Sequence, residues 1–150
     1  MFPPLELKRL RTATPETVKF PPALMEMLTD DDLEVRRGAT FALGKIGPAA
    51  KAALPAIRAN FDSKAELRPV SIWAMVHIAP DDEKIADQAV PLLIAALKRE
   101  ESIVRFHAAD TLGLIAPRAR AAIPALEAVS EDPDLHVRKA VTEALKKIKG

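Results

Sequence analysis

Apolar residues along this chain recur at spacings of three and four, which is typical of amphipathic helices. The segment "EVRRGATFALGKIGP", residues 34–48, shows the pattern, and its Gly-Pro ending marks the point where the helix cannot continue. No β-branched run alternates with polar residues, Tyr is absent and Gly is scarce. The pattern therefore predicts an all-α protein.

The same pattern returns three more times. Each copy carries an arginine that follows Val or Leu, at intervals of 32, 37 and 33 residues, and these arginines are Arg36, Arg68, Arg105 and Arg138. Small or apolar residues follow each arginine at offsets of three, seven and ten, and form one helical stripe. A further apolar run starts 13 or 14 residues before each arginine, and its markers are Pro22, Pro55, Pro91 and Pro124. The repeating unit is therefore predicted to be two helices joined by a short acidic turn.

The repeats set the expected organisation of a single domain over residues 1–150. We predict repeats at 15–48, 49–80, 81–117 and 118–150, with residues 1–14 as an N-terminal cap or partial repeat. Each proline marker should lie in the first turn of its helix, where the missing N–H costs little. Asp32 and Asp134 precede their arginines by four residues and should cap the second helix. Pro69 predicts a late start or a bend in the second helix of the second repeat.

Four segments carry a family resemblance. "DLEVRRGATFALGKIGP", "SIVRFHAADTLGLIAP", "DLHVRKAVTEALKKIKG" and the looser "ELRPVSIWAMVHIAP" resemble HEAT repeats, in particular the short HEAT-like repeats named after phycobilin lyases. The resemblance covers roughly residues 15–150. It implies a right-handed α-α superhelix (an α-solenoid) of about four two-helix repeats, with the second helices lining the concave surface. The signatures of ankyrin and tetratricopeptide repeats are missing.

The resemblance also implies a structural ladder of turn residues between successive repeats. That role would fall to Asp32 with Arg36 and to Asp134 with Arg138. Glu101 would substitute beside Arg105, whereas Lys64 beside Arg68 departs from the pattern. The members of the expected ladder are Asp32, Arg36, Arg68, Arg105, Asp134 and Arg138.

Comparison of the repeats with one another suggests a binding surface. Five residues after the four arginines come Phe41, Trp73, Asp110 and Glu143, and two charges at one register indicate a solvent-facing position. Phe41 and Trp73 are therefore expected to be at least partly exposed, and aromatic residues are common interface anchors. The predicted partner-binding patch consists of Phe41, Trp73, Phe106, Arg37, Lys45 and His77. The alternative is that these rings fill gaps between helices.

Composition and motifs argue against several classes of partner and site. The 150 residues include 22 basic and 21 acidic residues, so a nucleic-acid partner is not expected. Neither a signal-peptide run nor a membrane-spanning segment is evident, which predicts a cytoplasmic protein without membrane contact. There are no cysteines, the three histidines lack metal-pair spacing, and no Gly-rich phosphate loop exists, so neither metal nor cofactor is expected. The acidic turns are interpreted as helix caps.

The leading hypothesis is a non-enzymatic protein–protein interaction scaffold that binds a protein or peptide on the concave surface. A monomer is expected, with end-to-end association as the alternative. Three other functions stay open. They are a phycobilin-lyase-like enzyme subunit or chaperone, a fragment of a longer solenoid, and a DNA-binding relative of HEAT-like glycosylases, which the balanced charge disfavours.

Overall fold

The structure is a computed structural model that describes residues 22–150, so the predicted cap at 1–14 and the start of the first repeat lie outside the described residues. Short 3₁₀ segments occur at Gly47–Ala53, Ala65–Leu67, Ala116–Arg118 and Arg120–Ala122. The described part of the chain contains no strand, which confirms the all-α prediction. The α-helices are α2 (Pro22–Met27), α3 (Leu33–Ile46), α4 (Leu54–Ser63), α5 (Arg68–Ile78), α6 (Glu83–Ala96), α7 (Ser102–Leu114), α8 (Ile123–Ala128) and α9 (Leu135–Lys149).

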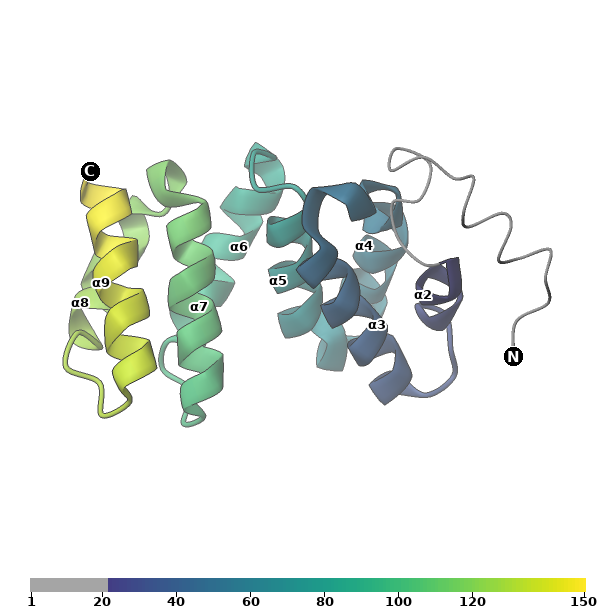
Figure 1. The fold of residues 1–150 in the computed structure, drawn as a ribbon, viewed down its shortest axis with the longest axis horizontal. Helices are drawn as coiled ribbons and strands as arrows, with labels where there is room; N and C mark the ends of the chain where they lie inside the picture. Colours follow the sequence, from purple (N-terminus) through teal and green to yellow (C-terminus); the bar gives the residue numbers. More distant parts are fainter. Residues whose placement is uncertain (1–21) are drawn as a thin grey trace, which may run out of the picture.

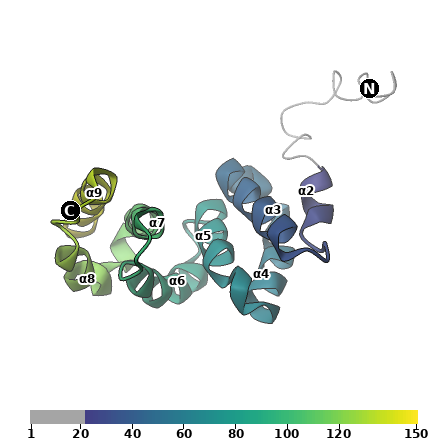
Figure 2. The ribbon, with the colours of Figure 1, turned by 90° about the horizontal axis from the view of Figure 1, so that it is seen from below.

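The helices pack as consecutive pairs, in which α2, α4, α6 and α8 are the first helices and α3, α5, α7 and α9 the second helices. Figure 1 shows the pairs following one another along the long axis, with α2 and α9 at opposite ends. Figure 2 shows the second helices along the inner side of a shallow arc and α4, α6 and α8 along its outer side. This arrangement is the predicted α-solenoid.

The apolar stripe of the second helices forms the core. The residues three after each arginine are all buried, and they are Ala39, Ser71, Ala108 and Val141. Leu43, Met75 and Leu112, seven after three of the arginines, are also buried. The core continues from one pair to the next, as stacked repeats require. Among residues 22–150, no helix has both the length and the apolar character needed to cross a bilayer.

Aspartates begin three of the helices. The Asp32 carboxylate accepts a 2.8 Å hydrogen bond from the N–H of Glu34, and Asp134 accepts one of 2.8 Å from His136. Both expected caps of second helices are thus confirmed. Asp82 caps α6 in the same way by accepting from the N–H of Ile85 at 3.1 Å. Each bond satisfies an N–H group that has no partner within its helix.

Two prolines distinguish the middle repeats. Helix α5 begins at Arg68 itself, whereas the other second helices begin one turn before their arginines. Pro69 occupies its first turn, which confirms the expected late start. The expectation for Pro91 is wrong, because α6 begins at Glu83 and places this proline inside the helix. The cap at Asp82 starts α6 upstream of the proline, and the longest interval between arginines provides the additional residues.

Candidate functional site

The residues at the contacts between neighbouring second helices differ in size from one repeat to the next. A Cβ on Gly44 in α3 would lie 2.9 Å from Cε3 of Trp73, closer still to Cζ3, and 3.0 Å from the Cα of Ala74, so only glycine allows α3 to approach α5 this closely. A Cβ on Gly113 in α7 would lie 3.6 Å from the Cα of Ala144 in α9, which is ordinary van der Waals contact. The equivalent residue of α5 is Val76, which is buried. Among neighbouring second helices, α5 and α7 are the least closely packed.

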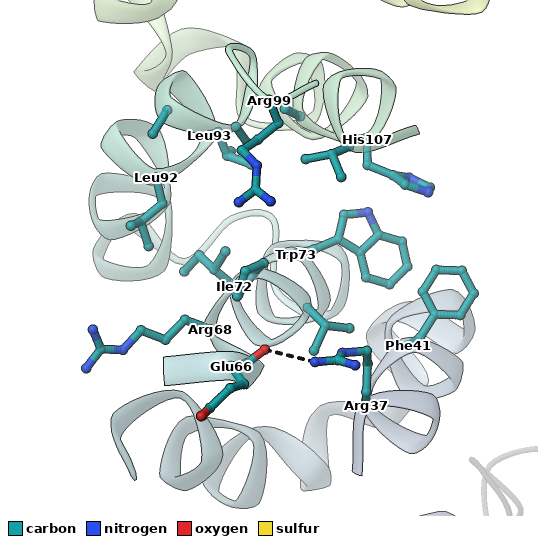
Figure 3. Close-up of a pocket in the computed structure, with 16 residues that line it drawn as sticks. Arg37, Phe41, Glu66, Arg68, Ile72, Trp73, Leu92, Leu93, Arg99 and His107 are labelled. Atoms are coloured by element: carbon teal, nitrogen blue, oxygen red, sulfur yellow. Dashed lines mark hydrogen bonds between the residues drawn. The ribbon is translucent and has the colours of Figure 1, made fainter. Parts of the chain in front are cut away.

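A cleft of about 690 Å³ opens where α3, α5, α6 and α7 meet. Its apolar wall includes Ile72 of α5, Leu92 and Leu93 of α6, and Val104 of α7. In Figure 3, Leu92, Leu93 and Ile72 lie across the cleft from Phe41 and His107, with Trp73 between them. This volume lies within the range of about 300–1,000 Å³ that is typical of ligand sites. The charged lining residues are Arg37, Glu66, Arg68 and Arg99.

An aromatic cluster, consisting of Phe41, Trp73, His77, Phe106 and His107, borders the cleft. The rings of Phe41 and Trp73 stack with their centroids 4.9 Å apart and an interplanar angle of 13°. His77 lies 4.3 Å from Trp73 on the same helix. His107 meets Trp73 edge-on at 5.7 Å and Phe106 at 5.3 Å. The cluster therefore joins the second helices of three successive repeats.

The two stacked rings differ in their exposure to solvent. Phe41 is 41% exposed, as expected, but Trp73 is only 7% exposed, so the expectation of an exposed Trp73 is wrong. The physical reason is that Gly44 leaves space for the indole, and Phe41 then covers it. The indole N–H is buried without a hydrogen-bond partner in the described structure. Trp73 is therefore part of the core, whereas Phe41 presents its ring at the surface.

The two histidines of the cluster favour the neutral form. Burial lowers the pKa of His77, although its hydrogen bond to the Trp73 carbonyl (Nδ1···O, 2.9 Å) and the nearby Asp110 carboxylate act in the opposite direction. Burial also lowers the pKa of His107, again against the effect of Asp110. Lys45 supplies a cation nearby, with its Nζ 5.9 Å from the centroid of the Phe41 ring.

The six residues of the predicted patch all belong to α3, α5 and α7. Trp73 contacts both Phe41 and His77, Phe106 joins them through His107, and Arg37 lines the cleft together with Phe41. The sequence comparison missed the contribution of a first helix, because it compared second helices only. It therefore missed Leu92 and Leu93 of α6 and Arg99 in the turn after it, and it also missed His107, which lies on the second helix α7.

The structure corrects the partners in the expected ladder. Asp32 and Asp134 cap their helices, and Arg36 and Arg138 donate instead to the backbone carbonyls of Asp30 and Asp132. Arg68 likewise donates to the carbonyl of Phe61, at 3.2 Å. The arginines thus share a role, because each holds the end of the preceding first helix or the turn after it.

Arg105 makes a largely buried ion pair between repeats. Its Nε and Nη2 donate to Oδ2 and Oδ1 of Asp132 in the following repeat, at 2.7 and 3.0 Å. These bonds lower the pKa of Asp132. Glu101, expected beside Arg105, lies 3.5 Å from Arg99. In the first repeat, Arg36 bridges forward to Asn60 at 3.2 Å. An Asp-x-Asp pattern in the turns was the signal in the sequence. Its second aspartate caps the following helix, and its first aspartate accepts hydrogen bonds from the arginines.

Comparison with protein families agrees with this arrangement. A family model described as HEAT repeats matches residues 62–146, which is more than half of the chain. A second model, described as HEAT repeat, matches residues 22–50. A search of curated proteins gave no match.

Proposed function

Because the chain belongs to the HEAT-repeat family, whose members are generally protein-interaction scaffolds, we propose that it is a non-enzymatic scaffold that binds a protein or peptide on the face formed by its second helices. The observation that carries this proposal is the position of Phe41. This ring is 41% exposed at the edge of an apolar cleft bounded by helices of three repeats. A partner that covers Phe41 would also reach the cleft.

The energies indicate how large the contact must be. An aromatic side chain buries roughly 150–250 Å² in all, so covering the exposed part of one ring contributes about 2 kcal/mol. Association itself costs an estimated 4–15 kcal/mol. The free energy gained by covering Phe41 is therefore too small to hold a partner on its own. The partner must also place side chains in the cleft and contact several repeats, which a continuous row of second helices allows.

Affinity capture from an extract of the source organism tests the proposal. We expect Phe41→Ala to reduce the recovery of partners while the protein stays folded, since Phe41 lies at the surface. Leu135→Ala is the matched control, because Leu135 is another exposed apolar residue of a second helix, at the start of α9. Equal recovery by wild type, Phe41→Ala and Leu135→Ala would contradict the proposed site. Circular dichroism spectra verify that each variant is folded.

A further inference from the structure

The cleft offers an apolar surface of the size of one or more large side chains. Leu92 is 39% exposed there, although Ile72 and Leu93 beside it are buried. Covering such a surface with another apolar group removes it from water and is favourable. The wall is built by α5, α6 and α7, and the exposed Phe41 of α3 extends it across the face of the solenoid. These features favour a ligand with at least one bulky apolar side chain.

The charges around the cleft are unbalanced in a protein whose net charge is only +1. Three arginines and one glutamate line it, and they are Arg37, Arg68, Arg99 and Glu66. Figure 3 shows the guanidinium groups of Arg37 and Arg99 directed into the cleft from opposite walls. Arg37 donates to the backbone carbonyl of Glu66 at 3.3 Å, while the Glu66 carboxylate turns away from it. The cleft itself therefore presents cations.

The acidic partners of these arginines are exposed and exchangeable. Arg37 pairs with Glu34, whose side chain is 74% exposed, and Arg99 pairs with Glu101, whose side chain is 54% exposed. Ion pairs of this kind contribute little to stability in water. A carboxylate on a ligand could replace either partner at small cost, and guanidinium groups bind carboxylates in a well-defined geometry.

We propose that this cleft binds an acidic peptide segment of a partner protein. A bulky apolar side chain of the segment occupies the space between Ile72, Leu92 and Trp73, and flanking carboxylates meet Arg37 and Arg99. The inference rests on the proposed function and adds the chemical class of the partner. A segment of several residues matches a site that extends over three repeats. Basic segments are excluded by repulsion from the same arginines.

Defined peptides test the charge requirement. Four pools of short fluorescent peptides are compared by fluorescence anisotropy. Three of them contain Leu and Phe, placed among Asp and Glu (the acidic–apolar pool), among Asn and Gln (the amide pool) or among Lys and Arg (the basic pool). The fourth contains Asp and Glu with Ser in place of the apolar residues. We expect the acidic–apolar pool to bind about fivefold or more tightly than the amide pool, with the difference shrinking as salt is added. Trp73 is the single tryptophan, so a change in its fluorescence on addition of unlabelled peptide reports contact at the cleft.

A pair of neighbouring variants locates the charge effect. Arg99→Gln should weaken binding of the acidic–apolar pool about fivefold and leave the amide pool unchanged. Lys98→Gln removes the same charge from the adjacent exposed residue, which does not line the cleft, and should have no effect beyond general screening. Both variants are expected to fold, because both side chains are at the surface. Equal effects of the two substitutions would overturn the assignment to Arg99.

The outcomes separate this inference from the proposed function. If the acidic–apolar and amide pools bind equally and Phe41→Ala weakens both, the binding face stands and the preference for acidic segments is wrong. If no pool binds, the cleft is not a peptide site, and capture with Phe41→Ala still tests the face on its own. Tighter binding of the basic pool would also overturn the inference.

Discussion

Replacing Gly44 by alanine tests how α3 and α5 fit together. The added methyl group would lie 2.9 Å from Cε3 of Trp73, closer still to Cζ3, and 3.0 Å from the Cα of Ala74. Overpacking of this kind costs about 1–3 kcal/mol, whereas alanine in place of glycine within a helix gains at most about 1 kcal/mol. We therefore expect Gly44→Ala to lower the free energy of unfolding by about 1–2 kcal/mol, because the indole is enclosed and cannot move away cheaply.

Urea denaturation measures this difference, and the same helix provides a control. Nothing lies within 4 Å of a Cβ on Gly38, so Gly38→Ala should raise the free energy of unfolding by about 0.5–1 kcal/mol. Combining Gly44→Ala with Trp73→Ala should remove most of the clash, giving a coupling energy of about 1–2 kcal/mol in the double-mutant cycle. A stabilising Gly44→Ala, or strict additivity with Trp73→Ala, would refute this account of the close approach.

Two further predictions concern the core and the link between repeats. Trp73→Ala should lower the free energy of unfolding by about 3–5 kcal/mol, whereas Phe41→Ala should cost about 1 kcal/mol, and similar values in urea titrations would be inconsistent with a buried indole under an exposed ring. Asp132→Asn should lower the melting temperature at neutral pH. Since Arg105 lowers the pKa of Asp132 in the folded state, that carboxylate stabilises the fold above its unfolded pKa and ceases to do so as pH falls through the folded pKa. The difference between variant and wild type should thus shrink below about pH 4; a constant difference in thermal unfolding across this range would contradict the role of the ion pair.

Periodicity was sufficient to predict a row of two-helix repeats, and the resemblance to HEAT repeats implied their stacking into a solenoid. Offsets from the arginines identified the buried stripe, for example Ala39 and Leu43, because a regular helix places the same offsets on the same side in every repeat. The comparison failed at Trp73, where equal offsets were assumed to have equal surroundings. Gly44, on the neighbouring helix, makes the difference, and its effect depends on the distance between two helices rather than on the sequence of either one.

The polar contacts of the expected ladder could also be predicted from the sequence only in part. Aspartates before a helix predict caps well, because the bond from Asp32 or Asp134 is local. The bond from Arg105 to Asp132 crosses between repeats, so the residue that reaches Arg105 depends on the distance between two helix pairs. The cleft was likewise invisible in the sequence, since Arg99 and Leu92 come from a segment outside the second helices.

The most direct test of the binding face is methyl NMR spectroscopy of the protein with and without a captured partner. We expect the methyl resonances of Ile72, Leu92 and Val104, which line the cleft, to change on binding. Those of Leu54 and Ile123, which are partly exposed in the first helices α4 and α8, should remain in place. Changes confined to Leu54 and Ile123, with the cleft methyl groups unaffected, would show that the partner binds the outer side and would contradict the proposed binding face.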